Sequence, residues 1–272
     1  MIPVAFDYQR VSSVDEALGL LATHGDEAKL LAGGHSLLPL MKLRLAVPSV
    51  LVDVGRLHDL SYVRDAGDHV AIGALTRHRD LETSELLAAQ VPILAHVAGQ
   101  VGDPQVRHRG TIGGSLAHGD PASDLPAVVL ALGGTLVARG PGGERTIEAR
   151  SFFEGFLQTA LGPDELLTEI RVPKATGGWS YQKFNRRAQD WAIVGAAAVR
   201  NGTTGVALVN MGSTPLRASA TEAALAAGAS IGDAAAVAAE GTEPSGDLNA
   251  SPDFRRHLAT VLVRRALEEA AS

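Results

Sequence analysis

Two glycine-rich segments contain the residues best suited to hold a ligand through the backbone. The first, residues 32–39, reads AGGHSLLP and follows a compact apolar run at residues 28–32. Gly33 and Gly34 can adopt backbone angles that are closed to other residues, which lets successive amide groups converge on a bound anion. The same glycines would serve a plain turn between a strand and a helix, so the segment alone predicts either a phosphate cradle or a turn.

The second segment, residues 109–124, reads RGTIGGSLAHGDPASD. It adds another amide-rich turn together with hydroxyls and carboxylates that can hold sugar hydroxyls. We expect residues 107–125 to form a long irregular segment, which in compact domains is usually functional. Neither glycine segment matches the GxGxxG or GxxxxGK[ST] patterns, so the ordinary nicotinamide fold and the P-loop are poorly supported. Two such segments suit a dinucleotide that contains a pyrophosphate.

The elements that must position the first segment can be predicted from local pattern. Apolar residues recur at helical spacing over residues 12–23, with Ser12 or Ser13 as N-cap and Glu16 three residues after Ser13, as in a capping box. Short apolar runs at residues 28–32 and 50–54 predict two strands on either side of the glycine segment. Strand, glycine turn, helix and strand together indicate an α/β unit at the start of the chain.

A second α+β unit is predicted further along. It has a strand at residues 68–72, a helix from about residues 80–85 onward and another apolar helix at residues 91–99. The sequence PKATGG at residues 173–178 is the clearest linker.

The alanine-rich chain after Leu216 favours helices, the last of them at residues 252–270 with an apolar stripe. We therefore predict three units, at residues 1–56, 57–173 and 178–272.

Composition excludes several classes of function. Lys and Arg number 24 against 30 Asp and Glu, for a formal charge of −6 without a run of like charges, so nucleic acid is not an expected partner. The absence of cysteine excludes thiolate-ligated iron–sulfur clusters in this chain. The 9 histidines lack the spacing of a metal site, which favours polar surface or loop positions and predicts no metal ligands. No secretory signal or membrane span is evident, so we expect a cytoplasmic protein.

Four segments in order and spacing resemble a known family. They read LLAGGHSLLPLMKLRL at residues 30–45, IGALTRH at 72–78, DPQVRHRGTIGGSLAHGDPASDLPA at 103–127 and YQKFNRRAQDWAIVGAA at 181–197. Together they resemble the FAD-binding medium subunits of molybdenum hydroxylases, the group that contains bacterial carbon monoxide dehydrogenase and relatives acting on N-heterocycles and aldehydes.

The resemblance implies an α+β fold. Two α/β subdomains would form a vanillyl-alcohol-oxidase-like FAD-binding fold, followed by a C-terminal α+β subdomain with a three-stranded sheet and helices. It also implies a set of FAD contacts: a pyrophosphate wrap at Ala32, Gly33, Gly34, His35, Ser36 and Leu37; a second phosphate and ribityl contact at Thr111, Gly113, Gly114 and Ser115, with His118 nearby; the ribityl or ribose hydroxyls at Asp124; the adenine side at Gly73, Ala74, Leu75 and Thr76; and the flavin and dinucleotide near Val101, Gly102, Leu167 and Lys183. Many relatives carry Asn where this chain has Ser115.

By the same resemblance, the chain would be an electron-transfer flavoprotein with no catalytic side chain of its own, because the flavin performs the redox chemistry. Its FAD would take electrons from the [2Fe-2S] clusters of a small partner subunit, reduced in turn by a large molybdenum-cofactor subunit, in a dimer of heterotrimers. The electrons would leave to an external acceptor. The substrate of such a complex, whether carbon monoxide, an aldehyde or an N-heterocycle, lies beyond this sequence.

Three alternatives stay open. The chain could be a stand-alone FAD-dependent oxidoreductase acting on a small molecule, or a binding module that has lost its flavin. Gly34, Ser36 and Leu38 also sit in a pattern close to the GxSxG elbow of α/β-hydrolases, with Asp124 and His257 as further triad members, but Leu38 stands where that elbow needs a small residue. The roles of four side chains are left undecided: Arg107, Arg109, Trp179 and Trp191.

Overall fold

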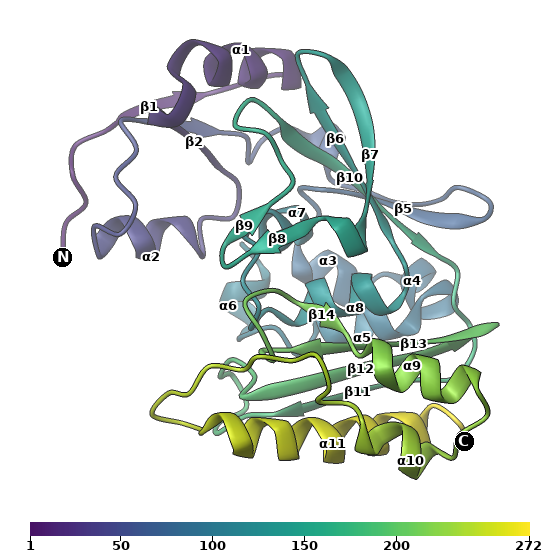
Figure 1. Ribbon diagram of the computed structural model, residues 1–272. Coiled ribbons are helices and arrows are strands. Elements are labelled where there is room, and N and C mark those ends of the chain that lie inside the picture. Colours follow the sequence, from purple (N-terminus) through teal and green to yellow (C-terminus); the bar gives the residue numbers. More distant parts are fainter.

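The computed structural model describes residues 1–272 and begins with a small parallel sheet (Figure 1). Its strand order is β1-β3-β2, from β1 (Asp7–Arg10), β2 (Ala28–Leu31) and β3 (Val50–Asp53). The helix α1 (Val14–His24) begins at Ser13, whose hydroxyl accepts a hydrogen bond from the Glu16 amide at 3.1 Å, as predicted. After β2, the glycine segment leads into α2 (Leu37–Lys42) and then into β3, which confirms the predicted order of elements.

The second unit is built on a five-stranded sheet of order β4-β5-β10-β6-β7, in which neighbouring strands run antiparallel. The strand predicted at residues 68–72 is confirmed by the strand at residues 69–73. Its neighbour in the sheet is a longer strand, at residues 166–173. The strands are β4 (Val63–Asp65), β5 (His69–Gly73), β6 (Thr135–Gly140), β7 (Gly143–Glu148) and β10 (Leu166–Pro173), with a separate small hairpin of β8 (Phe153–Gly155) and β9 (Gln158–Thr159).

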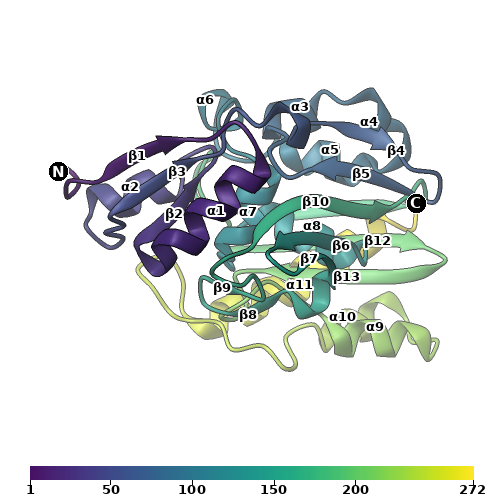
Figure 2. The ribbon, with the colours of Figure 1, turned by 90° about the horizontal axis from the view of Figure 1, so that it is seen from above.

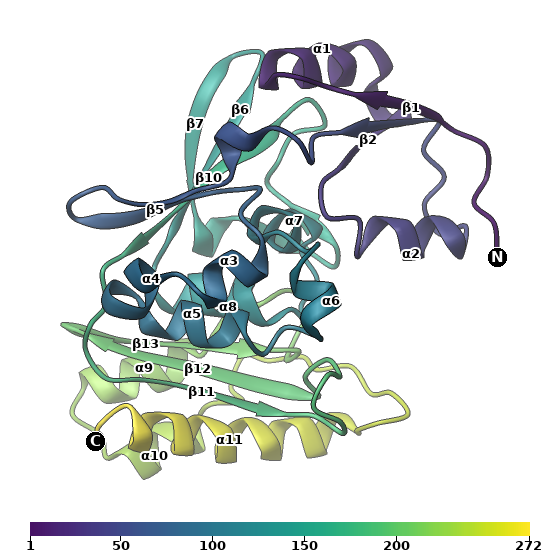
Figure 3. The same cartoon turned by 180° about the vertical axis from the view of Figure 1, so that it is seen from behind.

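Six short helices lie between this sheet and the C-terminal sheet, as Figure 3 shows. They are α3 (His78–Glu82), α4 (Glu85–Gln90), α5 (Pro92–Ala98), α6 (Pro104–Arg107), α7 (Ile112–His118) and α8 (Asp124–Ala131). Short 3₁₀ turns complete the regular structure of residues 1–173, at η1 (Gly25–Glu27), η2 (His58–Leu60) and η3 (Ala149–Ser151).

The C-terminal unit is an antiparallel sheet of order β11-β12-β13-β14 with helices on its outer face. Its two central strands are buried on both faces, since Ala197 and Val209 pack with α8 whereas Ala196 and Leu208 pack with the C-terminal helix. The elements are β11 (Trp179–Phe184), β12 (Val194–Asn201), β13 (Thr203–Val209), β14 (Leu216–Arg217), α9 (Ser219–Ala226), α10 (Ile231–Ala236) and α11 (Pro252–Glu269). A three-stranded sheet was expected, and the structure adds the two-residue strand β14 at its edge.

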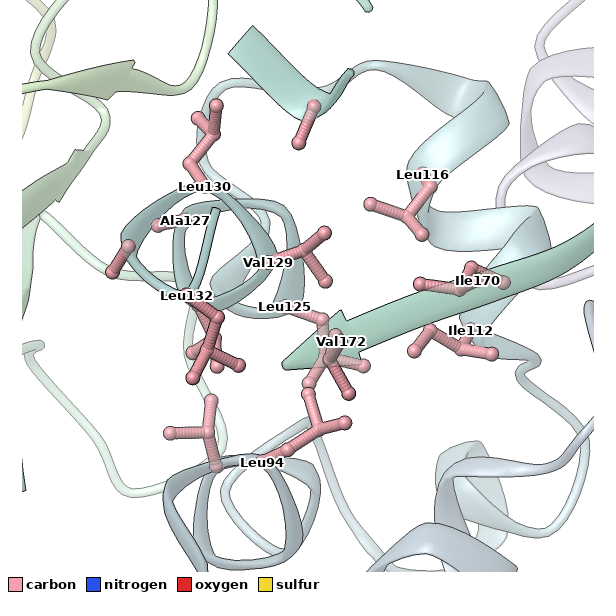
Figure 4. Packing of buried hydrophobic residues seen from close by; sticks show 14 of the residues in the cluster. Leu94, Ile112, Leu116, Leu125, Ala127, Val129, Leu130, Leu132, Ile170 and Val172 are labelled. Carbon is pink, nitrogen blue, oxygen red and sulfur yellow. The ribbon is translucent and has the colours of Figure 1, made fainter. Parts of the chain in front are cut away.

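The largest cluster of buried apolar side chains joins the helical layer to the sheets on both sides. In Figure 4, Leu116 of α7, Val129 of α8 and Ile170 of β10 converge in this layer. Because α7 and α8 contribute to the main core, the second glycine segment is held between buried side chains. None of the helices is long and apolar enough to cross a lipid bilayer.

Two local predictions were wrong. Residues 107–125 are not an irregular segment, because Thr111 caps the helix α7 through its side chain and the apolar residues Ile112 and Leu116 bury one face of it. The helix predicted from about residue 80 onward is interrupted, because Ser84 caps a new helix, α4, by accepting a hydrogen bond from the Leu87 amide.

Candidate cofactor-binding site

A large cavity opens where the small parallel sheet meets the helical layer and the five-stranded sheet. Its volume is about 790 Å³, within the range of cofactor and ligand sites. Figure 2 shows β2 and α7 on facing sides of this region, and the cavity is lined by residues that follow β2 and by residues of α7. The far wall comes from the C-terminal unit through Lys183 and Trp191.

Nearly all of the residues predicted to contact FAD line this single cavity. They are Ala32, Gly33, Gly34, His35, Ser36, Leu37, Ala74, Leu75, Val101, Gly102, Thr111, Gly113, Gly114, Ser115, His118, Asp124, Leu167 and Lys183. Segments that are separated by up to half of the chain are therefore brought to one place.

Two predicted residues lie outside the lining. Gly73 is packed against the backbone of Leu60, which leaves no room for a side chain or a ligand. The Thr76 hydroxyl is 2.9 Å from the carbonyl oxygen of Tyr62 and 3.0 Å from its amide nitrogen, so its hydrogen-bonding capacity is used within the fold. The adenine-side contact predicted for this segment is thereby reduced to Ala74 and Leu75.

The first glycine segment lines the cavity with four consecutive residues whose backbone amides are unpaired. The backbone amides of Gly33, Gly34, His35 and Ser36 donate to no carbonyl and no side chain of the protein. Gly34 has φ of 80°, in the left-handed region that favours glycine. Backbone amides that are left unpaired at a cavity wall are available donors for an anionic ligand, because such groups are seldom left without an acceptor.

The second glycine segment differs, which corrects the prediction of a second amide-rich cradle. The Gly113 amide donates to the Ala74 carbonyl at 2.8 Å, the Gly114 amide to the Thr111 hydroxyl at 3.2 Å and the Ser115 amide to the Thr111 carbonyl at 3.0 Å. These donors are occupied by the cap and first turn of α7. Contacts with a ligand from this segment must therefore come from side chains and from the glycine surfaces.

His78 is a buried residue of the cavity wall that the sequence interpretation did not select. Burial is the main cause that lowers the pKa of His78 to about 4, and the charge of His35 is the second cause. The ring is therefore neutral at neutral pH. Its Nε2 lies 3.4 Å from the Ser115 hydroxyl, and its Nδ1 is buried without a partner. Because this histidine is buried, the expectation of surface or loop histidines fails here. His78 is the last residue of the IGALTRH motif, which could have pointed to it. No second histidine stands at a spacing that would have singled it out.

Asp124 and Lys183 form a buried ion pair on the opposite wall. The Lys183 ammonium is 2.8 Å from Oδ2 of Asp124, and the two side chains are only 6% and 7% exposed. Tyr181 donates to the other carboxylate oxygen, Oδ1, at 2.5 Å. Burial raises the pKa of Asp124, whereas Lys183 and Tyr181 act in the opposite direction. Tyr181 was not selected from the sequence, because nothing marks a tyrosine in a strand as a partner of a residue 57 positions away.

Comparison with known proteins decides the family. Residues 4–175 match the family described as the FAD binding domain in molybdopterin dehydrogenase, and residues 179–270 match the carbon monoxide dehydrogenase flavoprotein C-terminal domain. The chain belongs to the medium, FAD-binding subunits of the molybdenum hydroxylases.

Three relatives match over nearly their whole length. The carbon monoxide dehydrogenase medium chain of Hydrogenophaga pseudoflava is 44% identical over 282 residues, which covers 99% of this chain and 98% of that protein. A solved structure of carbon monoxide dehydrogenase from the same organism, which lacks the Mo-pyranopterin moiety of the molybdenum cofactor, has a chain that superposes with a TM-score of 0.95 at 46% identity, covering 100% of this chain and 99% of that chain. Quinoline 2-oxidoreductase from Pseudomonas putida 86 superposes with a TM-score of 0.92 at 32% identity, covering 100% and 99%.

FAD is the cofactor of this family, and the residues of the cavity fit it. Four consecutive free amides suit a pyrophosphate, and the Ser115 hydroxyl and the Asp124 carboxylate are suitable partners for sugar hydroxyls. A side chain at Gly33 would collide with the carbonyl oxygen of Arg109, so the narrow approach of the two glycine segments requires glycine there.

The structure also bears on the hydrolase alternative and on the two arginines whose roles were undecided. His257 is exposed on α11 and does not line the cavity, and Asp124 is held by Lys183, so the hydrolase alternative lacks its triad. Arg107 pairs with Glu82 at 3.0 Å, whereas Arg109 is exposed.

Trp179 is partly buried and packs against the main core, whereas Trp191 is 59% exposed and lines the cavity. Only the first tryptophan is therefore part of the packed interior.

Proposed function

We propose that this chain is the electron-transfer subunit of a molybdenum-containing hydroxylase of the carbon monoxide dehydrogenase type. Its FAD accepts two electrons from the [2Fe-2S] clusters of a small partner subunit and releases the same two electrons to an external acceptor. The observation that carries the proposal is a single FAD-sized cavity with a row of free amides, in a chain that has no cysteine for clusters of its own.

Within this cavity we assign the cofactor contacts by chemistry. The free amides of residues 33–36 hold the pyrophosphate, and the Ser115 hydroxyl and Asp124 face the ribityl and ribose hydroxyls. Lys183, beside Val101 and Gly102, lies at the isoalloxazine end. When bound, the flavin supplies a centre that takes up and releases electrons, and this chain's residues bind and orient it.

The partners we propose are the small [2Fe-2S] subunit and a large molybdenum-cofactor subunit, in a dimer of heterotrimers. Apolar side chains exposed near the N-terminus and around α2 support a protein partner, because exposed apolar patches mark interaction surfaces. These segments lie side by side in Figures 1 and 3. The exposed residues are Met1, Ile2, Val4, Phe6, Tyr8, Leu38, Leu43, Leu45 and Val47. The division into units at residues 1–56, 57–173 and 178–272 and a cytoplasmic location stay predictions.

Two measurements test the proposal. The purified chain should be yellow and should release FAD, distinguished from FMN by chromatography, in near-equimolar amount. Affinity purification of the chain from its native host should recover iron and molybdenum in a fixed ratio to flavin.

The alternatives predict different results. A stand-alone FAD-dependent oxidoreductase would carry flavin without iron or molybdenum. A module that has lost its flavin would stay colourless, even when FAD is added to the chain together with its co-expressed partners.

A further inference from the structure

Tyr181 is a fully buried polar residue that no contact with the cavity explains. Its side chain lies behind the wall and does not line the cavity, whereas its two neighbours in the hydrogen-bond chain, Asp124 and Lys183, do. Burial raises the pKa of Tyr181 well above 10, so the phenol keeps its proton and acts as a donor at any physiological pH. Its hydroxyl therefore has one evident task, which is to hold the Asp124 carboxylate.

The fold places the three groups by simple geometry. Tyr181 and Lys183 are two residues apart on β11, so both side chains point to the same face of the sheet. Asp124 is the first residue of α8, which packs on that face. Opposite Lys183 on β12 stands Gly195, where a Cβ would come within 3.1 Å of the Tyr181 hydroxyl. Because Gly195 has no side chain, the Tyr181 hydroxyl has room at this position.

We infer that Tyr181 is a positioning residue of the flavin site: its hydroxyl fixes one oxygen of Asp124, so that the other oxygen anchors the Lys183 ammonium at the cavity wall. This inference rests on the proposed function, since it assigns the isoalloxazine end of the cavity to Lys183. Both carboxylate oxygens are engaged, one by each partner, at 2.5 and 2.8 Å. Without the phenol, the buried carboxylate lacks a partner and turns toward another donor, and Lys183 is left with the more distant Gln100 carbonyl, at 3.4 Å, as its fixed acceptor.

An anchored ammonium has a consequence for the bound cofactor. A positive charge near the isoalloxazine stabilises the reduced flavin, which carries more negative charge, relative to the oxidised flavin. The placement of Lys183 should therefore raise the reduction potential of the FAD, and Tyr181 should contribute to that potential without touching the cofactor.

The test compares the full-length FAD-loaded chain with Tyr181→Phe, Asp124→Asn and the double variant. Flavin fluorescence gives the dissociation constant for FAD, and equilibration with a redox dye gives the midpoint potential. We expect Tyr181→Phe to weaken FAD binding about tenfold. It should also lower the potential by about 30 mV, which corresponds to a tenfold change in the ratio of affinities for reduced and oxidised cofactor. In the Asp124→Asn background the same substitution should have less than about a twofold effect, because the two residues act as a unit.

A matched control is Tyr62→Phe, which also removes a phenol that donates to a carboxylate, that of Glu169, at 2.7 Å, but outside the cavity. It should leave both readouts unchanged. If Tyr181→Phe alone changes neither, or has its full effect in the Asp124→Asn background, Tyr181 does not act through Asp124 and the inference is wrong.

If Tyr181→Phe does not fold, Gly195→Ala decides, since its Cβ would crowd the same hydroxyl, together with Val209, at 3.1 Å and should lower the potential in the same direction. An unchanged potential in Gly195→Ala would overturn the inference. A wild-type chain that binds no FAD, even together with its co-expressed partners, would instead overturn the proposed function.

Discussion

The two glycine-rich segments of this chain have similar composition but use glycine for opposite purposes. In residues 33–36 the backbone amides have no acceptor in the protein, and all four residues line the cavity. In residues 112–115 the amides donate to the carbonyls of Thr76 and Ala74 and to the cap residue Thr111, and the glycines allow close packing instead. One segment is therefore a binding surface, and the other is part of the core that holds the binding surface in place.

The largest effect is expected from Gly113→Val in the second segment. A Cβ at Gly113 would lie 2.5 Å from the Cβ of Ala74 and 2.6 Å from its carbonyl oxygen, and neither can move without disturbing β5 or α7. We expect the free energy of unfolding to fall by about 3 kcal/mol in urea titration. Gly142→Val is the control, because nothing lies within 4 Å of that position, and it should have little effect. Equal stability of the two variants would contradict the packing role.

Gly33→Val should separate binding from stability. A side chain at Gly33 would push the first segment away from the carbonyl of Arg109, and this contact lies outside the buried apolar core. We expect FAD to bind about 100-fold more weakly, with a smaller loss of unfolding free energy than in Gly113→Val. The two quantities are measured by flavin fluorescence titration and urea denaturation. If Gly33→Val unfolds the chain while retaining FAD affinity, the assignment of the two segments is reversed.

The lowered pKa of His78, which lies beside the second segment, predicts how the free energy of unfolding depends on pH. Its folded pKa of about 4 is lower than the ordinary value of 6.5, so the unfolded chain binds the proton more readily. Its stabilising contribution is complete above pH 6.5 and is lost as the pH falls toward 4, by about 3 kcal/mol.

In His78→Gln, the unfolding free energy should change less steeply over this range in urea titrations at successive pH values. The exposed His257→Gln should keep the wild-type slope. Identical slopes in all three proteins would show that His78 does not titrate in this way.

The smallest effect is expected at Ser115, where the second segment contributes a side chain to the cavity. Ser115→Ala removes one neutral hydroxyl and should weaken FAD binding by about 1 kcal/mol, or roughly fivefold, with unfolding free energy nearly unchanged. Ser61→Ala, at an exposed position outside the cavity, serves as the reference in the same titration. A 100-fold loss, as expected for Gly33→Val, would mean that the second segment binds the cofactor as strongly as the first.

Much of the local structure could be predicted because its causes are local. Three predicted features depend only on residues that are close in sequence. They are the cap at Ser13, the apolar strand before Gly33 and the apolar stripe of the last helix. The resemblance of the motifs to a known family identified the cofactor, and nearly all of the residues that it implied as FAD contacts line the cavity. The helix predicted from about residue 80 is interrupted by the cap at Ser84, and the helix α7, capped by Thr111, was not predicted. In both places the capping side chain decides where a helix begins, and the spacing of apolar residues does not.

The sequence by itself determined that two segments had permissive backbones and small side chains. Only the tertiary structure decided what each segment does, because a free amide is defined by the absence of an acceptor, and the acceptor for Gly113, the Ala74 carbonyl, comes from a different segment. The same holds for Tyr181, whose partner Asp124 lies 57 positions away. Hydrogen bonds between distant segments depend on how the sheets and helices pack, and no local pattern encodes them.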